Sequence, residues 1–413
     1  MNRFFNLHKQ GKQVVLLYIT SLIGIIMGVF SSIVNTRFIS PADYGDVRYV
    51  QNIISFVASI LLVGYFLSGS RLLALSDDKV YCRRVKGVMT MILLLTIFVM
   101  MLVCLACYFI YHDNNTLSFL FIVSIPVCSY PILLNYLNTT AQGDNQIGRL
   151  TIARLMPALL YVPIAYSVYR FTGATSIKMI LLQWGIQVFF LSVIVISMKP
   201  IFTNLSPIWQ QLKKENKNYG FQLYIGSLVM VATNYLAGIS IGYFNTDNSE
   251  VGFYTLALTV TSPLMTLPTI IGTAYFKRFA SELRIPNKVL LYTILMTVIS
   301  CLLFIALIKP VVLFLYSKEY SVVGTYCIWL SLGFCLHGLG DMLNRYLGSH
   351  GRGKEIRNSS IANGVFKVFG YTVLVFYFNT IGAIITTVLC DFIYASMLYC
   401  YYVKYTTPLS HSN

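Results

Sequence analysis

Long apolar segments recur along the whole chain, and they constrain its fold more than any other feature. Twelve stretches of roughly 18 to 25 residues are each long enough to cross a bilayer as a helix. The segments between them are too short to hold a folded soluble domain. The pattern therefore predicts an all-α integral membrane protein with twelve transmembrane helices. The predicted spans lie at 14–36, 47–69, 88–111, 117–140, 150–170, 177–198, 221–244, 251–276, 289–308, 322–347, 360–378 and 381–403.

The distribution of charge predicts how these spans are oriented. Of the 413 residues, 57% are hydrophobic and 11% charged, which excludes a disordered chain, a nucleic-acid-binding domain and an ordinary soluble enzyme. If the spans alternate in direction, 23 of the 30 Lys and Arg fall on one side of the membrane and 6 on the other. Positive residues concentrate on the cytoplasmic side, so both termini are predicted to be cytoplasmic. The net charge of +16 then needs no nucleic acid as a partner.

Motifs for metal, cofactor or covalent chemistry are not found in the sequence. The nine cysteines are odd in number and lie mostly within apolar runs, so we expect inert thiols rather than a disulfide framework. Gly351-Arg-Gly-Lys354 lacks the spacing of a phosphate-binding P-loop. No His, Cys and carboxylate cluster has metal-ligand spacing. We therefore expect no cofactor and no enzymatic activity.

Two short segments recur at an offset close to half the length of the chain. Gly45 and Gly252 are 207 residues apart, and Gly143 and Gly351 are 208 apart. Six spans per half give both halves the same orientation, as in parallel repeats related by a pseudo-two-fold axis along the membrane normal. The sequence thus predicts two six-helix lobes, 1–210 and 211–413. We expect the glycines to permit tight reversals, which either serve as turns or contact a substrate.

At these corners the sequence resembles a known family. Phe38-Ile-Ser-Pro-Ala-Asp-Tyr-Gly45 is similar to the corner after the first span of Wzx-type O-antigen flippases. Pro310 to Leu315, followed by Lys318-Glu-Tyr320, is similar to their corner after the ninth span, although Tyr316-Ser317 stands where the family often has a glycine. The glycine-containing connections at 142–143 and 350–354 also fit. These flippases share a superfamily with multidrug extruders and the peptidoglycan-lipid flippase.

The resemblance implies an architecture and an activity. The two lobes would enclose a central cavity and rock to expose it to each side of the bacterial inner membrane in turn. The protein would move an undecaprenyl-diphosphate-linked oligosaccharide repeat unit from the cytoplasmic to the periplasmic leaflet, for lipopolysaccharide or another polysaccharide. Implied partners are this lipid-linked glycan, membrane lipids, a polysaccharide polymerase and a chain-length regulator.

Charged residues deep in the spans are the first candidates for the site, because a diphosphate bare in hydrocarbon is prohibitively costly. Lys367 lies about seven residues into its span, and it is interpreted either as a cavity cation or as one half of an interhelical ion pair. For Asp341 and Asp391 we favour ion pairing or coupling to protons or sodium, since a carboxylate repels phosphate. His337 is interpreted as a bonded core histidine or as a proton carrier.

Basic and amide side chains in other spans complete the predicted site. Arg48 and Arg154 lie slightly inside first-lobe spans and are the stronger candidates for phosphate binding. Arg37 and Arg345 lie nearer span ends. All four could instead extend to lipid headgroups. Gln51, Asn52 and Asn234 could bind sugars or join neighbouring helices.

Three other functions remain open from the sequence. A cation-coupled multidrug extruder of the same fold should have an acidic cavity, whereas cations outnumber anions at depth here. A membrane-embedded polysaccharide polymerase would usually carry a large outer loop, and no loop here exceeds about 15 residues. An accessory subunit of a surface-glycan complex is the third alternative.

Overall fold

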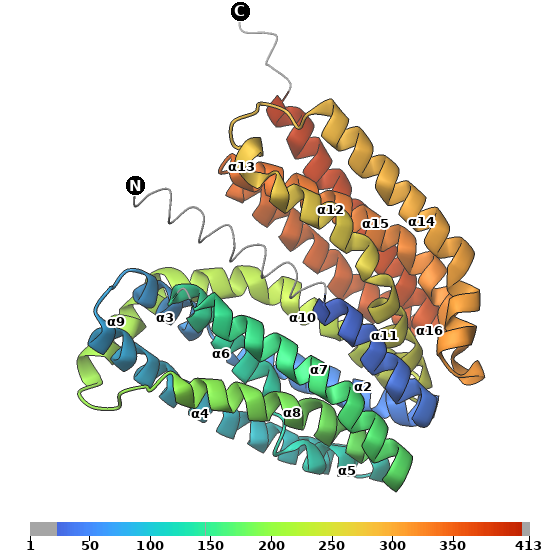
Figure 1. Ribbon diagram of the computed structural model, residues 1–413, viewed down its shortest axis with the longest axis horizontal. Coiled ribbons are helices and arrows are strands. Elements are labelled where there is room, and N and C mark those ends of the chain that lie inside the picture. Colours follow the sequence, from blue (N-terminus) through green and yellow to red (C-terminus); the bar gives the residue numbers. More distant parts are fainter. Residues whose placement is uncertain (1–22, 145, 407–413) are drawn as a thin grey trace, which may run out of the picture. The chain divides into compact units, whose positions relative to one another are not determined.

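The computed structural model describes residues 23–144 and 146–406, which form helices joined by short turns, with no strand among them (Figure 1). Part of the first predicted span, 14–36, lies outside these residues. The predicted all-helical membrane class is confirmed. Seven described helices are long and apolar enough to span a membrane, or eight if one bent pair counts as a single span. The count of twelve spans stays a prediction.

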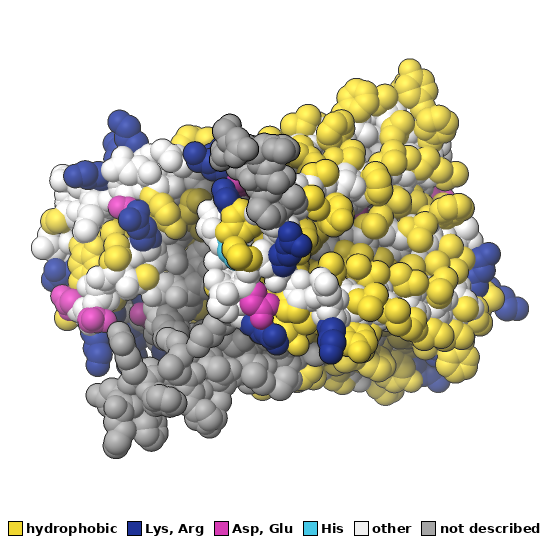
Figure 2. Space-filling view, turned by 90° about the horizontal axis from the view of Figure 1, so that it is seen from above, with side chains coloured by type: hydrophobic (Ala, Val, Ile, Leu, Met, Phe, Trp, Pro, Cys, Tyr) yellow, Lys and Arg dark blue, Asp and Glu magenta, His cyan; other side chains and the backbone are white. Residues whose placement is uncertain are grey.

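Hydrophobic side chains cover the outside of the long helices. Leu94, Leu95 and Phe98 are all more than half exposed on one turn and a half of a single helix. Figure 2 shows a broad continuous area of such side chains, with Lys and Arg gathered beside it. A soluble protein rarely exposes so large an apolar area, whereas lipid tails cover it at no cost.

The chain forms two compact units, Met1–Tyr235 and Leu236–Asn413. The first contains the helix Ile23–Phe38 and then α2 (Pro41–Leu61), α3 (Tyr65–Ala74), α4 (Lys79–Ile110), α5 (Asn115–Ser124), α6 (Tyr130–Gly143), α7 (Ile147–Thr172), α8 (Ser176–Ser197), α9 (Ser206–Glu215) and the π-helix η1 (Asn216–Gly220). Helix α10 (Phe221–Phe244) contains the boundary. The second contains α11 (Ser249–Thr261), α12 (Pro263–Ala274), α13 (Phe276–Phe279), α14 (Asn287–Leu315), the 3₁₀ turn η2 (Lys318–Tyr320), α15 (Val322–Ser349) and α16 (Gly353–Thr406).

Helix starts recur in the two halves at nearly the predicted offset. The starts of α2 and α11 are 208 residues apart, and so are those of α4 and α14. The starts of α7 and α16 are 206 apart. In the first half the second predicted span is interrupted by a 59° bend between α2 and α3. In the second half α11 and α12 adjoin at Ser262, whose φ of −53° and ψ of −30° are helical. The internal repeat thus extends from short motifs to the order of the helices.

Of the four corner glycines, only Gly351 has a left-handed conformation, and Gly143 is the last residue of α6. Gly45 and Gly252 lie within α2 and α11, so the prediction that they reverse the chain is wrong. The chain enters α2 at Ser40 instead, whose Oγ accepts a hydrogen bond from the Asp43 backbone N–H at 3.2 Å. Gly351 does adopt a left-handed conformation, with φ of +71°.

The segment after α8 is bound to the first unit. Arg71 on α3 forms a 2.6 Å ion pair with Glu215 on α9. Asn216 in η1 accepts from Ser68 Oγ at 3.0 Å and donates to the Val63 carbonyl at 3.1 Å. These bonds attach the segment around Glu215 and Asn216 to α3 and to the turn before it. The predicted division into lobes at 210/211 stays a prediction.

Glycines on α15 allow neighbouring helices in the second unit to approach closely. Gly333 and Gly340, seven residues apart, share a face that packs on the second half of α16. Gly338 faces α12, where an added Cβ would lie 2.8 Å from the Met265 carbonyl oxygen. Segment α16 itself comprises two helices that meet at Asn379, whose φ is +49° and ψ −134°. The predicted spans 360–378 and 381–403 lie on either side of this break.

We expect Gly338→Ala to destabilise the protein, because the new methyl group meets backbone atoms of α12. Overpacking of this kind costs about 1–3 kcal/mol. The matched control is Gly348→Ala on the same helix, where the nearest atom to the added Cβ is 3.7 Å away. Thermal unfolding of both variants in detergent checks this; equal melting temperatures would contradict it.

Candidate functional site

A cluster of ionisable side chains lies inside the second unit, between three helices. His337 and Asp341 are four residues apart and therefore share one face of α15. Asp391 lies on the second half of α16, and Lys367 on its first half. The sequence singled out all four residues, and the structure brings them together.

The Asp391 carboxylate lies at the centre of this charge cluster. Its Oδ1 is 3.0 Å from Nδ1 of His337 and 4.0 Å from Nζ of Lys367. Since an ionised carboxylate only accepts hydrogen bonds, Nδ1 of His337 carries the hydrogen in that contact. The other ring nitrogen, Nε2, is 4.0 Å from Oδ1 of Asp341. The imidazole thus lies between two carboxylates.

Neutral groups hold the second carboxylate and the imidazole in place. Tyr394 Oη donates to Asp341 Oδ1 at 3.2 Å, and Thr269 Oγ1 on α12 donates to Asp341 Oδ2 at 3.2 Å. Asn344 Nδ2 donates to Tyr394 Oη at 2.7 Å. The ring of Tyr394 also stacks on His337, with centroids 5.0 Å apart. These contacts fix both the position and the orientation of the imidazole.

The energetics show why the cluster needs more than one ion pair. The side chains of Asp391 and Lys367 are only 5% and 11% exposed. Each charge costs about 2.5–3.5 kcal/mol at a span centre on insertion scales, while two charges 4 Å apart attract by about 4 kcal/mol at an effective dielectric near 20. The attraction between Asp391 and Lys367 alone is smaller than the cost of placing both charges in the membrane. The hydrogen bond from His337, at about 1.5–3 kcal/mol for a bond to a charged group, makes up the difference.

The cluster can change its charge by one unit. It contains one lysine, two aspartates and one histidine, so its net charge is −1 with a neutral imidazole and zero with a protonated one. The arrangement is therefore suited to taking up and releasing a single proton.

A second group of hydrogen-bonding side chains lies one turn before Asp391 on α16. Thr387, four residues before Asp391, is 2.8 Å from Tyr254 Oη on α11 and 3.0 Å from Tyr371 Oη. All three side chains are buried. Hydrogen-bonding groups thus extend beyond the charges within the second unit.

In the first unit, the predicted arginines have amide partners. Arg48 Nη1 on α2 donates to Gln51 Oε1 at 2.8 Å, and Gln51 Nε2 donates to Gln183 Oε1 on α8 at 3.2 Å. Arg154 Nη2 on α7 donates to Asn138 Oδ1 on α6 at 2.9 Å. Within the described residues, neither arginine forms an ion pair. Both cations therefore keep a full charge for an anionic ligand.

The remaining predicted residues are dispersed. Arg37, Asn234 and Arg345 have exposed side chains, and Asn52 is half-buried. Arg345 lies one residue beyond Asn344, with its aliphatic stem beside Gly272 of α12. The structure joins Arg48 to Gln51 and Lys367 to Asp391, but places these two groups in different units.

Several partners were missed from the sequence. Gln183, Asn138, Thr269 and Tyr394 are ordinary polar residues in apolar helices. Tyr394 had a usable signal, because it follows Asp391 by three residues and so shares its helix face. His337 fits the interpretation as a bonded histidine.

The comparisons with known proteins concern the fold. No protein-family model and no curated protein sequence matches the chain. An inward-facing multidrug resistance MATE family transporter of the MOP superfamily is similar in structure, with a TM-score of 0.70, 15% identity and coverage of 97% of this chain and 100% of the other. The lipid II flippase MurJ, in an inward closed conformation, gives a TM-score of 0.73 at 13% identity, covering 94% and 87%.

A third similar structure is described by the polarity of its binding pocket. A MOP superfamily transporter from Pyrococcus furiosus, described as having a binding pocket of reverse polarity, gives a TM-score of 0.59 at 15% identity over 97% of each chain. The chain thus has the fold of MOP superfamily transporters. At these identities the similarity establishes the fold alone.

We expect Asp391→Asn to destabilise the protein by about 3–5 kcal/mol, because it leaves the buried Lys367 ammonium without a counter-charge. Adding Lys367→Met should recover part of this loss, since no unpaired charge then remains. The control adds Lys404→Met, an exposed lysine of α16, to Asp391→Asn. Unfolding in mixed micelles measures the three variants. If Lys404→Met rescues as well as Lys367→Met, the ion pair has no role.

Proposed function

We propose that the protein is a flippase that carries undecaprenyl-diphosphate-linked oligosaccharide, of the O-antigen type, across the bacterial inner membrane. Transport runs from the cytoplasmic to the periplasmic leaflet by alternating access, with both termini in the cytoplasm. The substrate is moved without covalent change. The observation that carries the proposal is the state of Arg48 and Arg154, two cations inside apolar helices whose partners are uncharged.

The pairing of Arg48 and Arg154 with amides favours an anionic substrate. Arg154 lies seven residues into α7, about 10 Å from its start at 1.5 Å per residue. An arginine at such depth is costly, and a carboxylate partner would remove most of that cost. Here each has an amide instead, which orients the guanidinium without neutralising it. Guanidinium groups bind phosphate oxygens through two parallel hydrogen bonds.

The other parts of the substrate need different surroundings. The isoprenoid tail can stay in lipid, so only the diphosphate and sugars have to cross. Gln51, Asn52 and Asn234 offer amide groups for sugar hydroxyls, with Arg37 and Arg345 as further cations. The MurJ neighbour, a lipid II flippase, is consistent with this type of cargo for the fold.

A cation-coupled multidrug extruder is the second candidate, because a MATE transporter shares the fold. Cationic drugs call for carboxylates that are free to pair with them. In the described part of the second unit, Asp341 and Asp391 are already bonded to Thr269, Tyr394, His337 and Lys367. This favours the anionic substrate.

For the driving force we propose proton coupling at the charge cluster of the second unit. A sodium ion at Asp391 would meet the ammonium group of Lys367, which is 4.0 Å from the same oxygen. A proton has no such conflict, because it binds the imidazole of His337 between two carboxylates. The groups that face this imidazole are Asp341, Asp391, Lys367, Tyr394 and, through Asp341, Thr269.

We expect Arg48→Gln and Arg154→Gln each to slow flipping by at least about tenfold, as the loss of one charge-assisted phosphate contact implies. The assay uses proteoliposomes with labelled lipid-linked oligosaccharide, and scores label that becomes accessible on the opposite leaflet. Arg170→Gln, an exposed arginine at the far end of α7, is the matched control. Wild-type flipping rates in both variants would remove the arginines from the site. Extrusion of a cationic dye without flipping would favour the drug extruder.

We expect an imposed proton gradient, acidic on the periplasmic side, to accelerate flipping by the wild type but not by His337→Gln, because glutamine cannot carry the proton. The electrical potential should still act on both, since it favours outward movement of an anion by about 2.3 kcal/mol per charge per 100 mV. His350→Gln at the end of α15 is the control and should respond like the wild type. A rate that follows a sodium gradient instead would refute proton coupling.

A further inference from the structure

A second group of cations lies in the first unit, separate from Arg48 and Arg154. Five helix ends, those of α3, α4, α6, α7 and α8, surround a cleft of about 690 Å³. Ligand pockets typically occupy about 300–1,000 Å³, so a small molecule or headgroup fits. Five basic residues line the cleft, against two acidic ones, Asp77 and Asp144. The basic residues are Lys79, Arg83, Lys86, Arg149 and Lys199.

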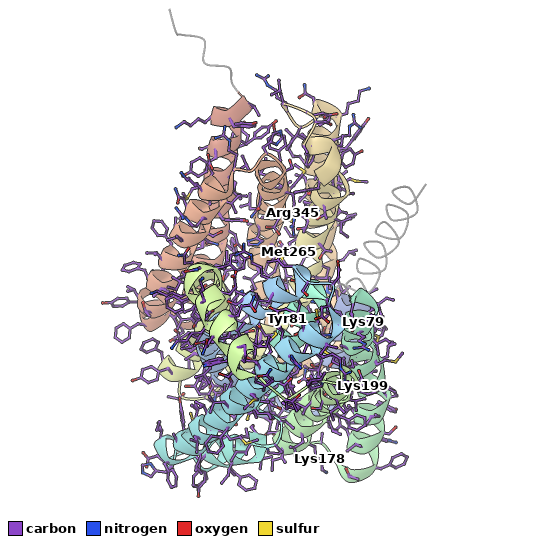
Figure 3. The ribbon with its side chains drawn as sticks, turned by 90° about the vertical axis from the view of Figure 1, so that its left-hand side faces the viewer. Lys79, Tyr81, Lys178, Lys199, Met265 and Arg345 are labelled. Carbon is purple, nitrogen blue, oxygen red and sulfur yellow. The ribbon has the colours of Figure 1, made fainter. Side chains whose placement is uncertain are left out.

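Most of this positive charge is not neutralised by the protein. Lys86 is buried and pairs with Asp144 at 2.5 Å. Within the described residues, the other four cations form no ion pair. Helix α7 also begins at the cleft without a side-chain cap, so its first N–H groups add positive potential there. The start of α4 is capped instead by Asp78, whose Oδ1 accepts from the Val80 N–H at 2.8 Å. In Figure 3, Lys79 and Lys199 lie on the same side of the first unit.

The wall that carries Lys199 is held in a fixed conformation. Arg83 Nε donates to the Lys199 carbonyl at 2.7 Å, and the Ile201 N–H donates to the Arg83 carbonyl at 3.0 Å. Gly87 makes this contact possible, since an added Cβ would collide with the Ile201 carbonyl oxygen. Lys199 itself has a φ of +49°, which is uncommon for a residue other than glycine. Local strain of this kind persists only where the surroundings impose it.

The preference for Lys and Arg on the cytoplasmic side of a membrane protein explains why these residues are basic. It does not explain why they line one cleft. The preference for positive residues on the cytoplasmic side is satisfied by lysines anywhere on that surface, as by Lys213 and Lys214 on α9. It does not require four unpaired cations around one preformed cleft. Preorganised cations of this kind bind multivalent oxyanions.

We propose that this cleft is a second anion site, which binds a phosphate or diphosphate group from the cytoplasmic side. Two sources share that chemistry: the headgroup of an anionic lipid and a soluble phosphate compound. The site does not depend on the proposed transport activity, because it lies at helix ends and shares no residue with the deep arginines. It would hold a phosphorylated ligand whether or not the head group of a substrate occupies the deep site.

The test measures binding rather than transport. Purified protein in neutral detergent is titrated with inorganic pyrophosphate and followed by its thermal stability, with chloride at equal ionic strength as the blank. A second arm compares nanodiscs of phosphatidylcholine with nanodiscs that contain phosphatidylglycerol. The variant carries Arg149→Gln and Lys199→Asn, because asparagine tolerates the left-handed conformation at position 199. The control carries Lys213→Gln and Lys214→Gln, the same loss of charge outside the cleft.

Stabilisation of the wild type and of the control by pyrophosphate is expected, with binding to the Arg149→Gln, Lys199→Asn variant at least about tenfold weaker for each cation removed. If only the anionic nanodiscs stabilise, and only when the cleft is intact, the ligand is a lipid headgroup. The proposal is overturned if neither probe stabilises the wild type, or if the cleft variant and the α9 control respond equally. A loss of flipping with intact binding would instead bear on the transport proposal alone.

Discussion

A charge inside an apolar helix has to be compensated, and two groups of charges in this chain are compensated in different ways. In the second unit, Lys367 and His337 share the carboxylate of Asp391, so that positive and negative charge lie within 4.0 Å. In the first unit, Arg48 and Arg154 have uncharged partners, which are amides and, for Arg48, also the ring of Tyr44 at 4.8 Å. The first arrangement is nearly neutral and stable without a ligand. The second leaves the charge of the arginines uncompensated, which is the basis for proposing an anionic substrate.

The packing of the second unit and its charge cluster depend on the same residues. An added Cβ at Gly333 would lie 3.3 Å from Asp391 Oδ2, and one at Gly340 would lie 3.0 Å from the ring of Tyr394. Because these two positions lack side chains, α16 approaches α15 closely enough for Asp391 to reach His337. Small residues at helix interfaces in membranes are usually explained by dispersion and backbone contact. Here they also set the distances of an ionisable network.

The all-helical membrane class could be predicted from the sequence, because it depends on a local property of the chain. Apolar length locates a span, and the position of Lys367 or Asp391 within a span gives its depth. Which charge meets which depends instead on the helix faces that come together, and this is set by Gly333 and Gly340 and by the break at Asn379. The amide partner of Arg154 could not be predicted for the same reason. The prediction that Gly45 and Gly252 reverse the chain was wrong because the helices begin earlier, after Ser40 and Asn248.

The proposed anion site and the proposed proton site bear on how transport could be driven. The membrane potential favours export of an anionic head group, but a cation that travels with the head group cancels that gain charge for charge. In the proposed mechanism, Arg48 and Arg154, whose guanidinium groups are oriented by amides, bind the head group without being released with it. In the proposed mechanism, protonation of His337 acts on the arginines by changing the conformational equilibrium of the molecule. A ligand shifts such an equilibrium only as far as it binds one state better than the other.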